Sequence, residues 1–376
     1  MDYTHDRFGP ERCRSETTHL DPPLHLLAGW PVAGVGYLPK IADGRMFASF
    51  LDGRVAAFQE GSAEPLWSFR LPESYEAALP NDGDLLVSGP VLLTRLGDEL
   101  FLLDAATGRL LDRQAVPQFN LRSALFDGSR LVGAYVDESH ERDEYFYACY
   151  DLWQRAILWQ HRSEQLPTSL AGSRQRVFVS ASLGQLSGLD TQAGTIFWTS
   201  SVQKIGAHRD LAKRASDGAI SGVPVVQRDL VIAAVRGYHI VAFDQATGAV
   251  RWDTAVEMIN PYTLACAADG TLAVIDDANY CQLDAATGRV LSRLNVADSF
   301  PAGEATQLTE IDVTTGYLYF CDVHRGVLRA MDRQTGQMPW SYRCANAVPV
   351  FNAPVVINGR LYLLDEGHHL YVFAGA

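Results

Sequence analysis

The sequence predicts an all-β fold: an eight-bladed β-propeller of four-stranded antiparallel blades, with seven blades as the alternative. One hairpin motif recurs along the 376 residues at nearly constant spacing. In the clearest copy, residues 241–252, an apolar run ends at Asp244, Thr247 and Gly248 follow, and Trp252 comes eight residues after the Asp. An Asp carboxylate accepts hydrogen bonds from N–H groups ahead of it, and glycine adopts a positive φ at low cost. The motif is therefore typical of a tight β-hairpin.

The copies are centred on eight anchor positions. These are Gln59, Asp104, Asp151, Asp190, Asp244, Asp284, Asp332 and Ala374. They span 315 residues in seven steps, a mean of 45, which suits one four-stranded propeller blade. A Trp stands eight residues after most anchors, and we expect it to pack between neighbouring blades. Asp112 and Ser292 occupy this position in the second and sixth copies, where the sequence predicts weaker packing.

The ends of the chain complement each other. Residues 1–22 are polar and read as a flexible tail, and residues 23–376 as one propeller domain. Residues 24–30 resemble an outer strand without preceding partners, whereas the last part of the chain holds only three strands. Pairing the N-terminal strand with those three completes the final blade and removes exposed sheet edges.

Composition limits the partners and the compartment. The formal net charge of −13 argues against binding to nucleic acid or to an anionic membrane, because phosphate neutralisation needs clustered Lys and Arg. No secretory signal is visible at the N-terminus, and no apolar run has the length of a membrane span. The six Cys are scattered without paired spacing and read as free, mostly buried thiols. We expect a cytoplasmic, bacterial protein.

Residues 103–109 and 283–289 both read Leu-Asp-Ala-Ala-Thr-Gly-Arg, and residues 243–252 read Phe-Asp-Gln-Ala-Thr-Gly-Ala-Val-Arg-Trp. These segments resemble the tryptophan-docking repeat of the pyrroloquinoline-quinone-like (quinoprotein alcohol dehydrogenase-like) propeller superfamily, over about residues 24–376. The resemblance implies eight blades. It covers quinone-dependent alcohol and sugar dehydrogenases and also non-enzymatic scaffolds such as the outer-membrane assembly lipoprotein.

The enzymatic branch requires groups that this sequence does not present. The alcohol dehydrogenases carry adjacent cysteines over the quinone, and no Cys-Cys pair occurs here. They hold calcium through Glu, Asn and Asp; Glu304, Asn260, Asp276 and Asp277 have these types without the spacing of a calcium loop. We therefore place the chain in the non-enzymatic branch and expect no catalytic, cofactor-binding or metal-binding residues.

Charged insertions indicate a binding face. The second-to-third-strand loops and the links between blades are expected on one face, which carries an acidic loop at 137–144 and a basic link at 203–218. Rigid scaffolds commonly bind through such loops. The candidate protein-binding residues are Asp137, Glu138, Glu141, Asp143, Glu144, Lys204, His208, Arg209, Lys213, Arg214, Arg236, Arg325 and His368. Arg95, Arg236, Arg325 and His368 could bind an acidic ligand or pair with nearby carboxylates; we favour the second.

The sequence thus predicts a non-catalytic cytosolic propeller, without a cofactor, that binds another protein. The acidic net charge favours a basic partner. An immunity or inhibitor protein for a toxin and an assembly scaffold both fit this description. The alternative is an oxidoreductase-like propeller that binds a quinone or another small ligand in its central channel.

Overall fold

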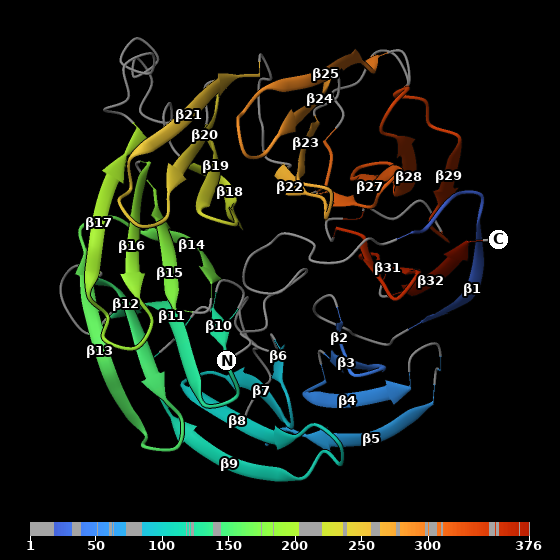
Figure 1. The fold of residues 1–376 in the computed structure, drawn as a ribbon. Coiled ribbons are helices and arrows are strands. Elements are labelled where there is room, and N and C mark those ends of the chain that lie inside the picture. The colour runs from blue at the N-terminus through green and yellow to red at the C-terminus, as the bar shows by residue number, and fades with distance from the viewer. Residues whose placement is uncertain are drawn as a thin grey trace. The chain divides into compact units, whose positions relative to one another are not determined.

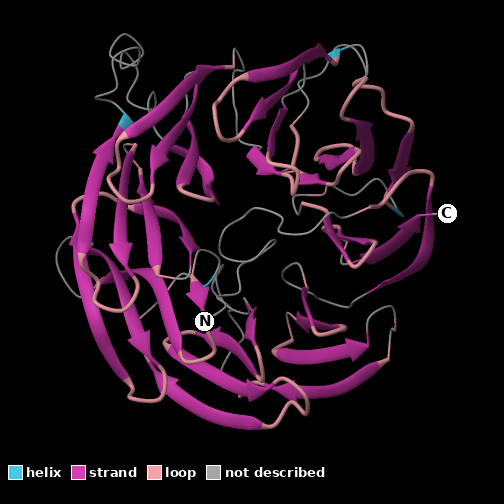
Figure 2. Ribbon diagram, viewed as in Figure 1, coloured by secondary structure: helices cyan, strands magenta, loops and turns pink. Residues whose placement is uncertain are grey.

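The computed structural model of the chain is built from β-strands (Figures 1 and 2). No α-helix occurs in the part that it describes, and the short cyan marks in Figure 2 are isolated 3₁₀ turns. No described segment could cross a membrane as a helix. The described residues are 19–31, 39–50, 52–59, 62, 64–72, 85–117, 119, 121, 124–137, 144–173, 175–182, 184–202, 220–235, 239–256, 264–275, 279–297, 300, 307–309, 311–345, 350, 353–367 and 369–375.

The strands form eight four-stranded sheets, here called blades 1 to 8. This confirms the prediction of an eight-bladed β-propeller and excludes the seven-bladed alternative. The described chain divides into two compact units, residues 39–182 with 187–198, and residues 19–31 with 184–186 and 199–375.

The first unit holds blades 1 to 3 and most of blade 4. Blade 1 comprises β2 (Lys40–Ala42), β3 (Arg45–Ser49), β4 (Arg54–Gln59) and β5 (Pro65–Arg70). Blade 2 comprises β6 (Leu85–Ser88), β7 (Val91–Leu96), β8 (Glu99–Asp104) and β9 (Leu110–Ala115). Blade 3 comprises β10 (Leu125–Phe126), β11 (Arg130–Asp137), β12 (Glu144–Asp151) and β13 (Ala156–Ser163). Blade 4 comprises β14 (Pro167–Ser173), β15 (Arg176–Ala181), β16 (Gln185–Asp190) and β17 (Ile196–Ser201).

The second unit holds the remaining blades. Blade 5 comprises β18 (Ile220–Gln227), β19 (Leu230–Val235), β20 (His239–Asp244) and β21 (Val250–Ala255). Blade 6 comprises β22 (Leu264–Cys266), β23 (Thr271–Ile275), β24 (Asn279–Asp284) and β25 (Val290–Asn295). Blade 7 comprises β26 (Asp312–Val313), β27 (Tyr317–Asp322), β28 (Val327–Asp332) and β29 (Trp340–Arg343). Blade 8 comprises β30 (Val355–Ile357), β31 (Arg360–Leu364), β32 (His369–Gly375) and β1 (Leu24–Pro31).

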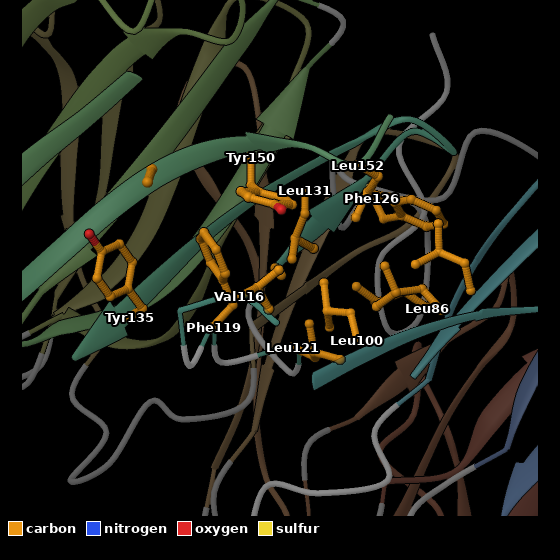
Figure 3. Packing of buried hydrophobic residues seen from close by; sticks show 14 of the residues in the cluster. Leu86, Leu100, Val116, Phe119, Leu121, Phe126, Leu131, Tyr135, Tyr150 and Leu152 are labelled. Atoms are coloured by element: carbon orange, nitrogen blue, oxygen red, sulfur yellow. The ribbon is translucent and has the colours of Figure 1, made fainter. Parts of the chain in front are cut away.

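Strand position within a blade explains the sequence pattern. The second strands are buried along their length, as in β7 and β19, because sheets cover both of their faces. The fourth strands alternate between exposed and half-buried residues, as in β5 and β21. Figure 3 shows the core between blades 2 and 3, where Leu86 and Leu100 of blade 2 pack near Phe126 and Leu131 of blade 3. The segment that links the two blades adds Val116, Phe119 and Leu121 to this core.

Blade 8 joins the two ends of the chain, as predicted. Strand β1 pairs antiparallel with β32, from Leu24 opposite Gly375 to Pro31 opposite His369. Leu20 is also buried, and its carbonyl accepts a 2.5 Å hydrogen bond from the Tyr319 hydroxyl in blade 7. The packed chain therefore includes residues ahead of Leu24, although the sequence assigns residues 1–22 to a tail; residues 1–18 lie outside the described residues.

The recurrent turn forms as predicted. The Asp244 carboxylate accepts hydrogen bonds from the N–H groups of Ala246 and Thr247, and from the Thr247 hydroxyl, at 2.9–3.0 Å. Gly248 closes the turn with a φ of 67°. Asp104, Asp284 and Asp332 make the same three contacts.

Three of the repeated Trp residues pack on the next blade, which confirms the prediction for these three. The indole N–H donates to the carbonyl of the residue after the next anchor Asp: Trp67 to Ala105 (3.2 Å), Trp159 to Thr191 (3.0 Å) and Trp252 to Ala285 (3.2 Å). The ring covers the turn glycine so closely that a Cβ on Gly108, Gly194 or Gly288 would lie 2.4–2.5 Å from a ring atom. The repeat thus encodes the contact between blades as well as the hairpin.

Candidate functional site

Only three of the thirteen predicted binding residues fall in the described part of the chain, namely Asp137, Glu144 and Arg325. The other ten lie outside the described residues: Glu138, Glu141, Asp143, Lys204, His208, Arg209, Lys213, Arg214, Arg236 and His368. The basic link at 203–218 is therefore not described.

The acidic loop of blade 3 begins and ends on an extended hairpin. Strands β11 and β12 are eight residues long, whereas the equivalent strands β7 and β8 of blade 2 have six. Asp137 and Glu144 pair at the end of this hairpin. The Glu144 carboxylate lies 2.8 Å from the Arg162 guanidinium of β13, whose side chain is 68% exposed. The sheet thus carries both acidic groups beyond the length of the neighbouring blade 2.

Of the four residues that we expected to pair with carboxylates, Arg95 and Arg325 lie in the described part of the chain. The Arg325 guanidinium lies 2.9 Å from the buried Asp322 carboxylate, which confirms that it pairs with a carboxylate. Arg95 is only 4% exposed and donates to the carbonyl of Phe119 at 3.0 Å. Arg95 therefore supports the chain between blades 2 and 3.

Blades 2 and 3 meet through polar side chains in place of the docked Trp. Gln114 donates from Nε2 to the Leu152 carbonyl at 2.6 Å, the carbonyl equivalent to those that bind the indoles elsewhere. The Asp112 carboxylate lies 2.7 Å from the Arg155 guanidinium. Burial acts to raise the pKa of Asp112, but hydrogen bonds from Gln114 and Arg113 and the charge of Arg155 outweigh it, and the pKa is lowered. The sequence predicts weaker packing between blades 2 and 3 at Asp112. That prediction did not foresee that polar contacts of Gln114 and Asp112 take the place of the docked Trp.

Arg155 stands where the other Asp-anchored turns have glycine. It has a φ of 54°, close to the 68° of Gly194, although it carries a side chain. The position tolerates a Cβ because blade 2 has Asp112 in the slot where a Trp would cover the turn. The position of the missing Trp in blade 2, Asp112, and the position of the missing glycine in blade 3, Arg155, contact each other directly.

Sequence reasoning missed a set of exposed apolar side chains on blades 3 and 4, here called the apolar rim. It comprises Trp153, Ile157, Leu158, Ile196 and Phe197, with exposed fractions of 54%, 37%, 36%, 39% and 47%. A signal was present in the repeat: the position two residues after the anchor holds Ala or Gln in the other Asp-anchored copies and Trp only at Trp153. Exposure of this Trp is visible only in the folded sheet.

The rim is held by well-defined backbone. The N–H of Trp153 donates to the Asp151 carboxylate at 2.9 Å. Strand β13 shifts register between Cys149 and Tyr150, so that Trp159 pairs with Cys149, Ile157 pairs with Tyr150, and Leu158 forms a bulge. Trp159 then anchors β13 on the turn of blade 4, which leads directly into Ile196 and Phe197.

The second unit offers a small polar pocket between the turns of blades 5 and 6. It has a volume of about 150 Å³, and its lining includes Asp229, Arg251, Asp269 and Asp284. Arg251 pairs with Asp229 at 3.3 Å, and Asp284 is engaged in its own turn. No three His, Cys, Asp or Glu side chains of the described residues are grouped to hold a metal ion.

Comparison with known proteins identifies relatives. A family model described as outer membrane protein assembly factor BamB matches residues 29–200, 142–315 and 281–376. The curated proteins give no match. The chain is similar to the crystal structure of BamB from Moraxella catarrhalis, with 19% identity and a TM-score of 0.66 over 93% of this chain and 99% of that chain.

Two other solved structures share the fold. Quinohemoprotein alcohol dehydrogenase from Comamonas testosteroni has 10% identity and a TM-score of 0.70 over 97% of this chain and 79% of that chain. The computationally designed Ika8 protein has 13% identity and a TM-score of 0.65 over 96% of this chain and 100% of that chain. Together with the family match, these likenesses confirm the predicted pyrroloquinoline-quinone-like propeller superfamily.

Proposed function

Because this chain belongs to the family described as outer membrane protein assembly factor BamB, we propose that it is a non-catalytic propeller that binds another protein. The fold alone does not decide between binding and catalysis, since propellers of this shape also occur in quinoprotein dehydrogenases. The proposal therefore depends on the surface of this chain.

The extended acidic hairpin of blade 3 is the observation that carries the proposal. It carries Asp137 and Glu144 on strands two residues longer than those of blade 2. A rigid sheet that presents charge in this way favours electrostatic steering of a partner, and the net charge of −13 favours a basic one. Affinity would then depend on apolar and aromatic contacts made after the encounter.

The test is purification of the tagged chain from its native host, followed by measurement of the isolated complex. We expect one stoichiometric protein partner. Replacing Asp137, Glu138, Glu141, Asp143 and Glu144 by Ser should slow association and weaken its dependence on salt, with the thermal unfolding midpoint retained. Unchanged association kinetics would remove the hairpin from the interface.

The same preparation tests the alternative, an oxidoreductase-like propeller. Pyrroloquinoline quinone with calcium should leave the unfolding midpoint unchanged if the proposal is right. Saturable stabilisation by the quinone would overturn it in favour of a cofactor-binding protein.

The partner decides between the two finer versions of the function. A toxin whose activity is lost on binding would identify an inhibitor or immunity protein, whereas a partner that gains further subunits would identify an assembly scaffold. We propose the cytoplasm as the compartment; the five buried cysteines of the described chain are free thiols, which suits a reducing environment. Fractionation of host cells tests this proposal. Recovery of the chain in the envelope fraction would contradict it.

A further inference from the structure

Strand β28 of blade 7 has an arginine where the third strands of the other blades have an uncharged residue. Arg329 stands three residues before the anchor Asp332, and the equivalent positions of the seven other copies hold Ala, Phe, Ser, Val, Cys or Tyr. Arg329 is half-buried. Its guanidinium lies over the Phe300 ring at 5.7 Å from the centroid, and Nη1 lies 3.9 Å from Met338 Sδ. A charged group is thus held against the apolar core between blades 6 and 7.

Arg329 has no anionic partner among the described residues. It forms no ion pair with any of their carboxylates, and its Nε is buried without a hydrogen-bond acceptor. Burial lowers the pKa of Arg329, and the charges of Arg325 and Arg343 lower it further, against the opposing effect of Asp322. A buried donor without a partner calls for an acceptor from outside the chain, such as an ion.

The register of three strands places this guanidinium on one charged face of the blade 7 sheet. The partner of Arg329 in β29 is Ser341, and the partner of Val327 is Arg343. Val327 also pairs with Asp322 of β27. Because side chains alternate along a strand and cross-strand partners share a face, Asp322, Arg329 and Arg343 lie on the same face. Arg329 and Arg343 are diagonal neighbours, about 7–8 Å apart, which is within reach of two long side chains.

The charges on this face do not cancel. Arg325 lies 2.9 Å from the Asp322 carboxylate, so these two groups neutralise each other. Arg329 and Arg343 remain, because neither forms an ion pair with a carboxylate of the described chain. The Asp332 carboxylate accepts hydrogen bonds within its own turn and lies on the opposite face of β28. Three arginines against one aspartate leave a local charge of +2 on a chain of net charge −13.

We propose that Arg329 and Arg343 bind the phosphate group of a small molecule on this face of blade 7. Guanidinium groups recognise phosphate through paired hydrogen bonds. A phosphate monoester carries about −1.5 to −2 charges at pH 7 and matches the two unpaired guanidinium groups, whereas one carboxylate would compensate only one of them. The exposed Arg343 gives access from solvent, and Arg329 lies deeper. The site goes beyond the proposed protein-binding function, because it shares no residue with the acidic hairpin.

The experiment measures binding of inorganic phosphate and of phosphoserine to the full-length chain by isothermal titration calorimetry, near pH 7 and at constant ionic strength. We expect both to bind saturably, and the tighter one tells whether the ligand is the free ion or an ester. Acetate should bind about tenfold more weakly than phosphate. Arg329→Met and Arg343→Gln should each weaken phosphate binding by about tenfold or more, because each removes charge-assisted hydrogen bonds. Arg329→Lys should recover part of this loss, because it restores the charge without the planar fork.

Blade 1 supplies a matched control. Arg70 stands eleven residues after its anchor, as Arg343 does, and is also exposed, but Ala56 occupies the position of Arg329. Arg70→Gln removes the same charge from the chain outside the proposed site, so it should bind phosphate as tightly as the unaltered chain. Thermal unfolding of every variant separates lost binding from lost folding. Phosphate should raise the midpoint of the unaltered chain and of Arg70→Gln, and leave that of Arg329→Met unchanged.

Four results would overturn the proposal. The unaltered chain could show no saturable phosphate binding, or Arg329→Met could bind phosphate as tightly as the unaltered chain. Arg70→Gln could lose as much affinity as Arg343→Gln, which would show that only the overall charge matters. Acetate could bind as tightly as phosphate, which would assign the face to a carboxylate. Because the acidic hairpin of blade 3 is outside this site, each of these results leaves the protein-binding proposal to its own test.

Discussion

At the scale of single residues, the turn glycines serve two purposes. Gly194 has a φ of 68°, and an added Cβ would lie 2.4 Å from Cγ of Trp159. Gly89 also has a positive φ, 53°, but a Cβ there would meet nothing within 4 Å. The pair separates the cost of backbone conformation from the cost of blocking a docked indole.

We predict that Gly194→Ala lowers the free energy of unfolding by about 3 kcal/mol or more, since the left-handed conformation costs about 1–2 kcal/mol and the blocked indole adds overpacking. Gly89→Ala should lower the free energy of unfolding only by the cost of the left-handed conformation, about 1–2 kcal/mol. Urea unfolding followed by tryptophan fluorescence measures both. Equal losses in the two variants would show that the close approach to Trp159 contributes nothing.

The anchor carboxylates make stability depend on pH. Hydrogen bonds from the Thr247 hydroxyl, and from the N–H groups of Thr247 and Ala246, lower the pKa of Asp244 below its usual 3.8 against the opposing effect of burial. The pKa values of Asp104 and Asp284 are lowered by equivalent bonds. A lowered folded-state pKa stabilises the fold at pH values above the unfolded-state pKa, and this contribution is lost as pH falls through the folded-state pKa.

We therefore predict that the urea midpoint is constant from pH 7 to about pH 5 and falls steadily below about pH 4. The double variant D244N/D284N keeps an oxygen acceptor in each turn and removes two titrating groups. It should show a shallower fall below pH 4. A fall as steep as that of the unaltered chain would mean that these turns are not the source of the acid sensitivity.

At the scale of elements, three contacts between blades are matched pairs of an indole from one outer strand and a glycine in the next turn: Trp67 with Gly108, Trp159 with Gly194, and Trp252 with Gly288. The contact between blades 2 and 3 breaks both halves of this pair at once, with Asp112 for the Trp and Arg155 for the glycine. Gln114 preserves the hydrogen bond to the turn carbonyl. The two departures should therefore be energetically coupled.

Rebuilding the common pair tests this coupling. We predict that Asp112→Trp and Arg155→Gly each destabilise the chain, because the first meets an occupied turn and the second leaves Asp112 without its cation. The double variant should be more stable than the sum of the single effects by about 1–3 kcal/mol. Strict additivity in this double-mutant cycle would show that the two positions do not share a contact.

The sequence predicts the blades well because the turn chemistry is local. Asp244, Thr247 and Gly248 lie within five positions, so their hydrogen bonds follow from the chain itself. The contact made by Gln114 joins residues 38 positions apart, and nothing in the repeat marks Gln114 as a substitute for Trp. The candidate site follows the same division: charge predicts the acidic loop, whereas the exposure of Trp153 depends on how two blades pack.

At the scale of the whole molecule, blade 8 depends on both ends of the chain. Strand β1 contributes Leu24 to the core, and Leu20 ahead of it joins the same cluster with Tyr371 and Phe373. Without β1, strand β32 would be the outer edge of a three-stranded sheet with apolar residues uncovered. An uncovered edge of this type invites association with other chains.

We predict that removal of residues 1–31 lowers the unfolding midpoint and causes concentration-dependent aggregation. A synthetic peptide of residues 19–31 added in trans should raise the midpoint and suppress the aggregation, because it restores the pairing of β1 with β32. The same peptide with Leu20 and Leu24 replaced by Ser is the control and should not rescue. Normal behaviour of the truncated chain would mean that blade 8 is stable with three strands.

The order of synthesis delays the pairing of β1 with β32. Strand β1 leaves the ribosome first, yet its partner β32 is made 345 residues later, from Leu24 to His369. At typical elongation rates of 5–20 residues per second, the leucine-rich first strand waits about 17–70 s for the last one. A nascent-chain chaperone would find in Leu26 and Leu27, which are 44% and 55% exposed even after folding, a segment to shield during that interval.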